Sequence, residues 1–403
     1  MLMHGLAKIT DINLLEYEGM RDDFIVFDLL DDNQVWGEVL HKINEDFGKA
    51  KDVEKTGGSK LTRNDRDSYA KTYSQWFGIQ LDENVDYISF LSSILNGVAV
   101  LLKKNRINVL ESFSTINVKK GKMYLGVKDY GYAIIPSIIK QMEYYERSTE
   151  YMKPTTSVKS MIYLDPLWFS ILSIGILYCY AGYYGGSYYF VTKPDIDMFF
   201  GSPYLNLALN CIHTVSSSNI RLKKSLEYEE IYEFLLSLDL AEREKATKEH
   251  QEYLWPLRIY KENLERNVFV AKKVYDIDLG MLLDFCKKYY NSIDTLRIMG
   301  EREYRIKLYQ ESMDPLKALF VLAEREARTN ISDDNEMIAF IAAKDIYRAV
   351  NSRNYKLLEN TLFRLLRKSS VVRSGDRYSY EVSVVFRAFS KESVVNAILN
   401  AMS

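Results

Sequence analysis

Between Asp165 and Lys193 the chain contains no charged side chain, and this run constrains the fold more than any other part of the sequence. A run of this length can cross a bilayer if it forms one helix. Its tyrosines, however, lie in the middle and second half, whereas membrane spans place tyrosine at the two interfaces. The Gly185-Gly186 pair also divides the run. We expect a helix over Leu167–Ala181 that is buried on every side, then a turn and a strand over Ser187–Thr192, and we keep a membrane span as an alternative.

Length and composition describe a globular protein with a large core. The chain has 403 residues, of which 47% are hydrophobic. Lys and Arg (53) nearly balance Asp and Glu (55), so attraction to nucleic acid must come from local charge. Three separated cysteines indicate buried, reduced thiols and no zinc site. The absence of a leader pattern predicts a cytoplasmic protein, and abundant Tyr, Lys, Arg and Glu favour a thermophilic source.

The first half of the chain mixes strand and helix signals. We expect a strand at Phe24–Phe27, helices at Val35–Phe47 and Ile88–Leu102, a polar loop at Lys49–Asp67, and a hairpin over Val109–Val127. The GGSK letters in the polar loop lack the spacing of a phosphate-binding loop.

Further helices are expected beyond the hairpin. The sequence predicts a helix at Ile135–Tyr151, a helix or strand at Tyr204–Val215, and a helix at Leu226–Leu240.

Helix signals dominate the last third. The predicted helices are Leu279–Tyr290, Arg302–Gln310, Pro315–Arg328, Asn335–Val350 and Tyr355–Lys368. A hairpin over Val371–Phe389 and a helix over Ser390–Met402 complete the chain.

The expected fold class is therefore α+β. A mixed α/β domain with an aromatic, glycine-rich core helix occupies residues 1–240, a charged linker or connecting segment 241–277, and a helical bundle with a small hairpin 278–403.

Three basic clusters are candidates for contact with nucleic acid. The first has seven basic residues and one acid from Lys103 to Lys128, with Phe113 and Tyr124 among them. Its candidate contacts are Lys103, Lys104, Arg106, Lys119, Lys120 and Lys122. The second cluster is Arg221, Lys223 and Lys224. The third is Lys356, Arg364, Arg367, Lys368, Arg373 and Arg377.

Each cluster also has a structural explanation. Lysine-rich hairpins keep edge strands soluble, and the second cluster resembles a loop that caps the following helix. In the third cluster, Leu357, Leu358, Leu362, Leu365 and Leu366 form the expected inner stripe of a helix whose opposite face is basic.

Catalytic signals are weak. Cys211-Ile212-His213 is the closest approach to a dyad, and Asp22-Asp23 or Asp31-Asp32 offer carboxylates for magnesium. Core packing and turn formation explain these residues more simply. We expect no enzyme activity, no cofactor and no metal.

The order of features resembles the large subunit of the archaeal Cascade-type (type I-A) CRISPR interference complex. The resemblance lies in the run from Ile174-Gly175 through Tyr183-Tyr184-Gly185-Gly186 to Phe190 and Lys193-Pro194, between a mixed α/β part and a helical bundle. It implies a non-catalytic subunit that reads a short protospacer-adjacent motif on double-stranded DNA and helps to hold the displaced single strand. It also implies partners in the guide RNA–protein complex and a separate helicase-nuclease. The alternatives are a structural or adaptor protein without nucleic acid, and a membrane protein.

Overall fold

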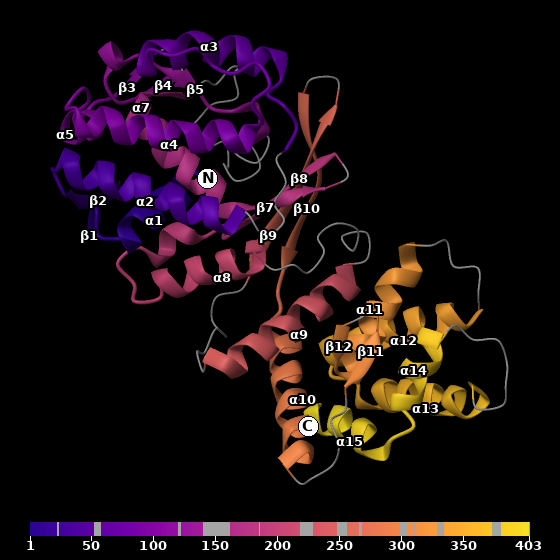
Figure 1. Ribbon diagram of the computed structural model, residues 1–403. Helices are drawn as coiled ribbons and strands as arrows, with labels where there is room; N and C mark the ends of the chain where they lie inside the picture. Colours follow the sequence, from indigo (N-terminus) through magenta and orange to yellow (C-terminus); the bar gives the residue numbers. More distant parts are fainter. Residues whose placement is uncertain are drawn as a thin grey trace. The chain divides into compact units, whose positions relative to one another are not determined.

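The structure is a computed structural model (Figure 1). It describes residues 1–402 apart from 22–23, 52–57, 120–121, 140–161, 185, 218–228, 248–255, 266–267, 299–304, 309–310, 329–333 and 373–379. The expected helix at Ile135–Tyr151 lies mostly outside the described residues.

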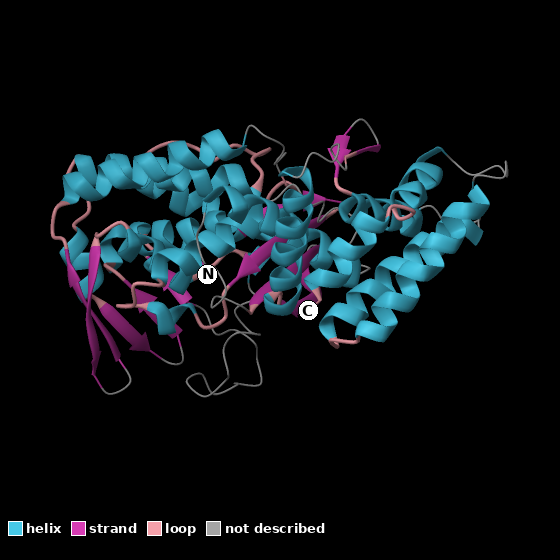
Figure 2. Cartoon of the chain, turned by 90° about the horizontal axis from the view of Figure 1, so that it is seen from below, coloured by secondary structure: helices cyan, strands magenta, loops and turns pink. Residues whose placement is uncertain are grey.

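The chain divides into two compact units. The first comprises Met1–Ser217 and Pro256–Asp276, and the second comprises Ser218–Trp255 and Ile277–Ser403. These limits differ from the three ranges expected from the sequence, because strands and helices both run through the segment expected to link two domains. Figure 2 shows strands in magenta among cyan helices, and the α+β class is confirmed.

Helix α7 (Pro166–Cys179) forms the centre of the first unit. Its residues are buried except for Tyr178, which is partly exposed, and the Asp165 side chain caps its N-terminus. Strand β7 (Tyr180–Tyr184) and the wholly buried strand β8 (Ser187–Thr192) follow it. The expected buried helix and the expected strand at Ser187–Thr192 are confirmed. The helix ends at Cys179 rather than at Ala181, and Tyr180–Tyr184 forms a strand that was not expected. None of the helices built from described residues combines the length and apolar character of a bilayer span.

Helix α1 (Leu2–Asp11) crosses α7 with backbone against backbone. A Cβ atom added to Gly5 would collide with the carbonyl oxygen of Ile171, and one added to Gly175 would collide with that of Met1. Two glycines thus allow the helices to approach more closely than side chains would permit.

Three more helices of this unit follow one another along the chain. They are α2 (Asn33–Lys51), α3 (Arg63–Phe77) and α4 (Tyr87–Lys103). Helices α2 and α4 lie side by side, and α4 also packs on α7. The expected polar loop at 49–67 is shorter than predicted, since α2 reaches Lys51 and the Thr62 hydroxyl caps α3.

Four antiparallel strands form the sheet that follows α7. Its order is β10-β9-β8-β7, with β9 at Leu257–Glu265 and β10 at Val268–Ile277. These residues, expected to lie in a linker or connecting segment, form strands. Strand β8 is buried throughout and needs hydrogen-bonded neighbours on both edges, and β9 supplies one of them despite its charged sequence.

A second four-stranded sheet has the order β3-β4-β6-β5. Its strands are β3 (Ile116–Lys119), β4 (Lys122–Leu125), β5 (Ala133–Ile134) and β6 (Ile162–Leu164). The hairpin is confirmed, but its predicted start is wrong, because Val109–Ser114 forms helix α5. The Asn108 side chain caps that helix by accepting from the Glu111 N–H.

The remaining elements of the first unit are short. They are the hairpin β1 (Leu15–Arg21) and β2 (Phe24–Leu29), helix α8 (Leu205–Ser217), and 3₁₀ turns η1 (Lys128–Tyr130), η2 (Ser137–Ile139) and η3 (Ile196–Phe199).

The described part of the second unit is mainly helical. Its helices are α9 (Glu229–Thr247), α10 (Gly280–Ile298), α11 (Pro315–Arg328), α12 (Asp334–Asn351), α13 (Tyr355–Val372), α14 (Tyr380–Ala388) and α15 (Glu392–Ala401). The rings of Phe234 on α9 and Phe320 on α11 stack with centroids 3.9 Å apart. Helix α9 packs on α10, α11 and α12, so it belongs to this core.

Two expectations for the second unit are wrong. Arg302–Gln310 was expected to be helical, but β11 (Ile306–Leu308) pairs with β12 (Glu311–Met313). Val371–Phe389 was expected to be a hairpin, but α14 occupies most of its second half. The buried residues of α14, Val382, Val385 and Phe386, recur at helical spacing, which competes with the β-branched composition.

Strand β9 carries an unusual buried acid. Glu262 is paired with Tyr188 of β8, is fully buried, and has no hydrogen-bond partner for either carboxylate oxygen among the described residues. Burial raises the pKa of Glu262 to about 8. The folded protein therefore holds this side chain mostly as the neutral acid at neutral pH.

Replacing Glu262 with Gln is expected to stabilise the protein above neutral pH. The favourable contribution of the protonated acid is fully present below its ordinary pKa of 4.5 and is lost as the pH rises toward 8. Thermal and urea unfolding across this window should show the wild type losing roughly 4 kcal/mol relative to E262Q. The matched control, Glu265→Gln on the exposed end of the same strand, should keep the wild-type pH dependence. Identical pH profiles for the wild type and E262Q would contradict the prediction.

Candidate nucleic-acid interface

The register of the β3-β4-β6-β5 sheet separates a buried face from a solvent-facing one. Leu125 is aligned with Leu164, and both are buried. On the opposite face Tyr124 is aligned with Tyr163, and both are partly exposed. Successive side chains of a strand point to opposite faces of the sheet. The side chains that do not point toward the core therefore point toward solvent.

Three aromatic rings gather on the solvent-facing side. Tyr124 and Tyr163 stack with centroids 4.7 Å apart and an interplanar angle of 12°. The ring centroid of Tyr132 lies 5.3 Å from that of Tyr124, and the Tyr132 hydroxyl donates to the Gly126 carbonyl at 2.6 Å. We call Tyr124, Tyr132 and Tyr163 the tyrosine platform.

Lysines border the tyrosine platform. The Lys122 ammonium lies 5.5 Å from the centroid of the Tyr163 ring and 3.5 Å from its hydroxyl. Lys119 is opposite Lys122 in the hairpin and is exposed. The sheet thus combines cations that attract phosphate with ring faces on which a base can stack.

Asp165 connects this sheet to the buried helix. Its carboxylate accepts from the Ser112 hydroxyl at 2.7 Å, the Val127 N–H at 3.0 Å and the Trp168 N–H at 2.9 Å. Burial raises the pKa of Asp165, whereas these hydrogen bonds act in the opposite direction. The same carboxylate therefore caps α7 and holds the segment that follows β4.

The other basic residues of the first cluster lie elsewhere. Lys103, Lys104 and Arg106 are exposed at the C-terminus of α4, and helix α5 separates them from β3 in the chain. Phe113 is partly exposed, and its ring packs against the buried rings of Trp36 and Trp168, so it is not part of the platform.

Helix α13 presents a second basic face. Lys356, Asn360 and Arg367 are exposed on it, and Phe363 lies among them with 51% of its surface exposed. Arg364 belongs to the same helix, but its guanidinium pairs with Asp345 at 2.6 Å. We call Lys356, Asn360, Phe363 and Arg367 the outer face of α13.

The inner side of α13 is confirmed only in part. Leu358, Leu362 and Leu365 are buried as expected. Leu357 is partly exposed, and Leu366 is 36% exposed, so its assignment to the inner stripe is wrong. Lys368 is partly exposed at the margin of this face.

Six predicted contact residues lie outside the described residues, and they are Lys120, Arg221, Lys223, Lys224, Arg373 and Arg377. The whole second basic cluster is among them.

Sequence reasoning missed Tyr132, Tyr163 and Phe363. Tyr163 is separated from the lysine-rich hairpin by 38 residues or more in the chain, and only the parallel pairing of β4 with β6 brings it beside Tyr124. Helical spacing could have identified Phe363 from the sequence, because it places this residue on the same outward side as Lys356, Asn360 and Arg367.

The structure places the weak catalytic candidates as follows. On α8, Cys211 is buried and His213 is exposed, so the two side chains lie on different sides of the helix. Asp32 accepts from the Gln34 and Val35 N–H groups at the start of α2. Within the described ranges no group of three or more His, Cys, Asp or Glu side chains is placed to hold a metal ion. Asp22-Asp23 lies outside those ranges.

Comparison with known proteins places this α+β chain in a family. A family model described as "CRISPR-associated protein (Cas_Csx9)" matches residues 37–399. Because the match spans most of the chain, the protein belongs to this CRISPR-associated family. No curated protein and no solved structure matches it.

Removing the Asp165 carboxylate is expected to destabilise the first unit strongly. In Asp165→Ala, the buried Ser112 hydroxyl and the Val127 and Trp168 N–H groups lose their acceptor, which should cost about 2–4 kcal/mol. Chemical denaturation would measure this loss. Asp129→Ala, at an exposed acid of the nearby turn η1, is the control and should change stability by less than about 0.5 kcal/mol. Equal stability of the two variants would refute the role given to Asp165.

Proposed function

We propose that this protein is a non-catalytic, nucleic-acid-binding subunit of a CRISPR antiviral interference complex. The observation that carries the proposal is the stacked pair Tyr124–Tyr163 beside Lys119 and Lys122 on the solvent-facing side of a sheet. Membership of a CRISPR-associated family supports the setting.

The tyrosine platform suits an unpaired strand. Bases inside a duplex are already stacked on one another, whereas a single strand can turn its bases onto aromatic side chains. Lys119 and Lys122 then contact the backbone between bases. In an interference complex this strand is the one displaced when guide RNA pairs with its target.

The outer face of α13 suits a phosphate backbone. Lys356 and Arg367 lie about three helical turns apart and supply charge, and Asn360 supplies a hydrogen-bonding amide between them. We propose that this face contacts double-stranded DNA while the protein reads a short protospacer-adjacent motif. The proposed role is that of the large subunit of a Cascade-type, type I-A complex.

The proposal assigns cutting to a separate helicase-nuclease and guide binding to other subunits of the guide RNA–protein complex. It places the protein in the cytoplasm. The groups gathered on both faces are cations, amides and aromatic rings, which bind and position nucleic acid. The rival proposal is an adaptor that contacts only proteins.

Reversing the two hairpin lysines is expected to weaken binding and its salt dependence. Lys119→Glu with Lys122→Glu should lower affinity for a single-stranded oligothymidine at least ~10-fold and reduce the log–log salt slope by about 1.4, or about 0.7 for each lost phosphate contact. Fluorescence anisotropy at several salt concentrations measures both quantities. Lys42→Glu, at an exposed position on α2, is the matched control. Unchanged affinity in the folded double variant would refute the role of the hairpin, and a stable partner complex without nucleic acid would favour the adaptor.

Removing one ring of the platform is expected to weaken binding without changing the salt slope. Tyr163→Leu loses the stacking surface and should cost roughly 1–3 kcal/mol of affinity for the same single strand. Tyr163→Phe keeps the ring and should retain most of the affinity, although it loses the hydroxyl contact with Lys122. Blunt-ended duplex of the same length should bind both variants equally. A similar loss in Y163F and Y163L would show that the hydroxyl, rather than stacking, carries the contact.

A further inference from the structure

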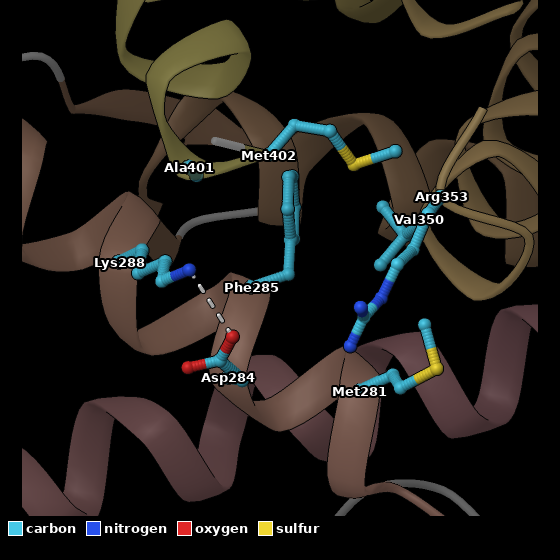
Figure 3. Close-up of a pocket in the computed structure, with 8 residues that line it drawn as sticks. All are labelled: Met281, Asp284, Phe285, Lys288, Val350, Arg353, Ala401 and Met402. Carbon is cyan, nitrogen blue, oxygen red and sulfur yellow. Dashed lines mark ion pairs between the residues drawn. The ribbon is translucent and has the colours of Figure 1, made fainter. Parts of the chain in front are cut away.

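A cavity of about 190 Å³ opens in the second unit between α10, α15 and the C-terminal end of α12 (Figure 3). Its floor is apolar and buried, and consists of Phe285, Val350 and Ala401. Its rim is more exposed and includes the thioethers of Met281 and Met402. A buried apolar floor within an exposed rim is the form of a socket that receives an anchoring side chain.

Arg353 occupies this rim in an unfavourable backbone conformation. Its φ of 50° is left-handed, which suits glycine much better than a long side chain. The residue closes α12, where the Arg353 N–H donates to the Val350 carbonyl and the Asn354 N–H to that of Ala349. Helix ends of this geometry usually carry glycine. An arginine in this conformation departs from local preference, and a role for its side chain would explain the departure.

The charges of the cavity leave one cation available. Lys288 and Asp284 neutralise each other at 3.3 Å on one side of it. The guanidinium of Arg353 extends toward Met281 on the other side (Figure 3) and forms neither an ion pair nor a side-chain hydrogen bond with the described residues. The cavity therefore favours an occupant that carries one negative charge beside an apolar group.

The volume of the cavity limits the size of the group that it can hold. Pockets for drug-sized ligands and cofactors span roughly 300–1,000 Å³. A cavity of about 190 Å³ is smaller than these and accommodates about one large side chain. The flexible side chains of Met281 and Met402 on the rim can adapt to the shape of an inserted side chain.

We propose that this cavity is a docking socket for a partner protein that inserts one aromatic or aliphatic side chain next to a carboxylate, which pairs with Arg353. Because CRISPR-associated proteins function in multiprotein assemblies, such a partner belongs to the same assembly. The inference concerns different residues from the nucleic-acid surfaces and does not depend on them.

The test uses the whole chain labelled with ¹³C at the methionine methyl groups. The probe is the capped dipeptide acetyl-Glu-Phe-amide, and the resonances of Met281 and Met402 are assigned with Met281→Leu and Met402→Leu. We expect saturable shifts of these two resonances at millimolar probe. Acetyl-Glu-Ala-amide should bind at least about tenfold more weakly because it lacks the anchor, and acetyl-Lys-Phe-amide up to about fivefold more weakly because it lacks the carboxylate.

Arg353→Gly separates folding from docking. Glycine suits the left-handed position, so the melting temperature should stay the same or rise by up to about 3 °C, while acetyl-Glu-Phe-amide should bind up to about fivefold more weakly than to the wild type. Arg353→Lys keeps the charge and should retain part of the response. Single-strand binding should be unchanged in both variants.

Three results would overturn the proposal. They are the absence of any shift with acetyl-Glu-Phe-amide, equal shifts in the wild type and R353G, and stronger shifts with adenosine monophosphate, which would indicate a nucleotide site.

Discussion

Helix α7 has no face that can remain in water, and this constraint determines the arrangement of the first unit. Protein must cover it on every side, and α1, α4, α8 and β8 all pack against it. The tightest of these contacts depends on Gly5 and Gly175, because any Cβ there would meet a carbonyl oxygen. Apolar burial is the dominant favourable contribution to folding, and α7 contributes to it along nearly its whole length.

The same helix controls the exposed sheet through its N-terminal cap. Asp165 binds the first turn of α7, the Ser112 hydroxyl and the chain after β4 with one carboxylate. These contacts hold the buried face of the sheet in place against α7. The opposite face, which carries the stacked tyrosines, faces solvent. In the proposed function this rigid support matters, since the rings would be ordered before a flexible single strand arrives.

The second unit shows how a helical bundle keeps charged and aromatic groups on its outer side. In α13, three leucines complete the core, and the outward side keeps Lys356, Phe363 and Arg367 exposed. Arg364 illustrates the limit of counting charges, because Asp345 neutralises it within the bundle. At the end of α12, the backbone conformation of Arg353 runs against local preference, which distinguishes that residue from an ordinary helix terminus.

The sequence by itself determined the buried α7, strand β8, five of the helices in the last third, and the outward charges of α13. Each rests on local periodicity or on an unbroken apolar run, which adjacent residues specify. Only the tertiary structure decided the rest. Strand β9 has a charged sequence typical of a linker and is a strand because it pairs with β8, which requires a neighbour on that edge. Tyr163 joins Tyr124 only through the parallel pairing of β6 with β4, and Arg353 faces its cavity only because α10, α12 and α15 meet there. Contacts between residues distant in the chain depend on three-dimensional packing, and no local pattern encodes them.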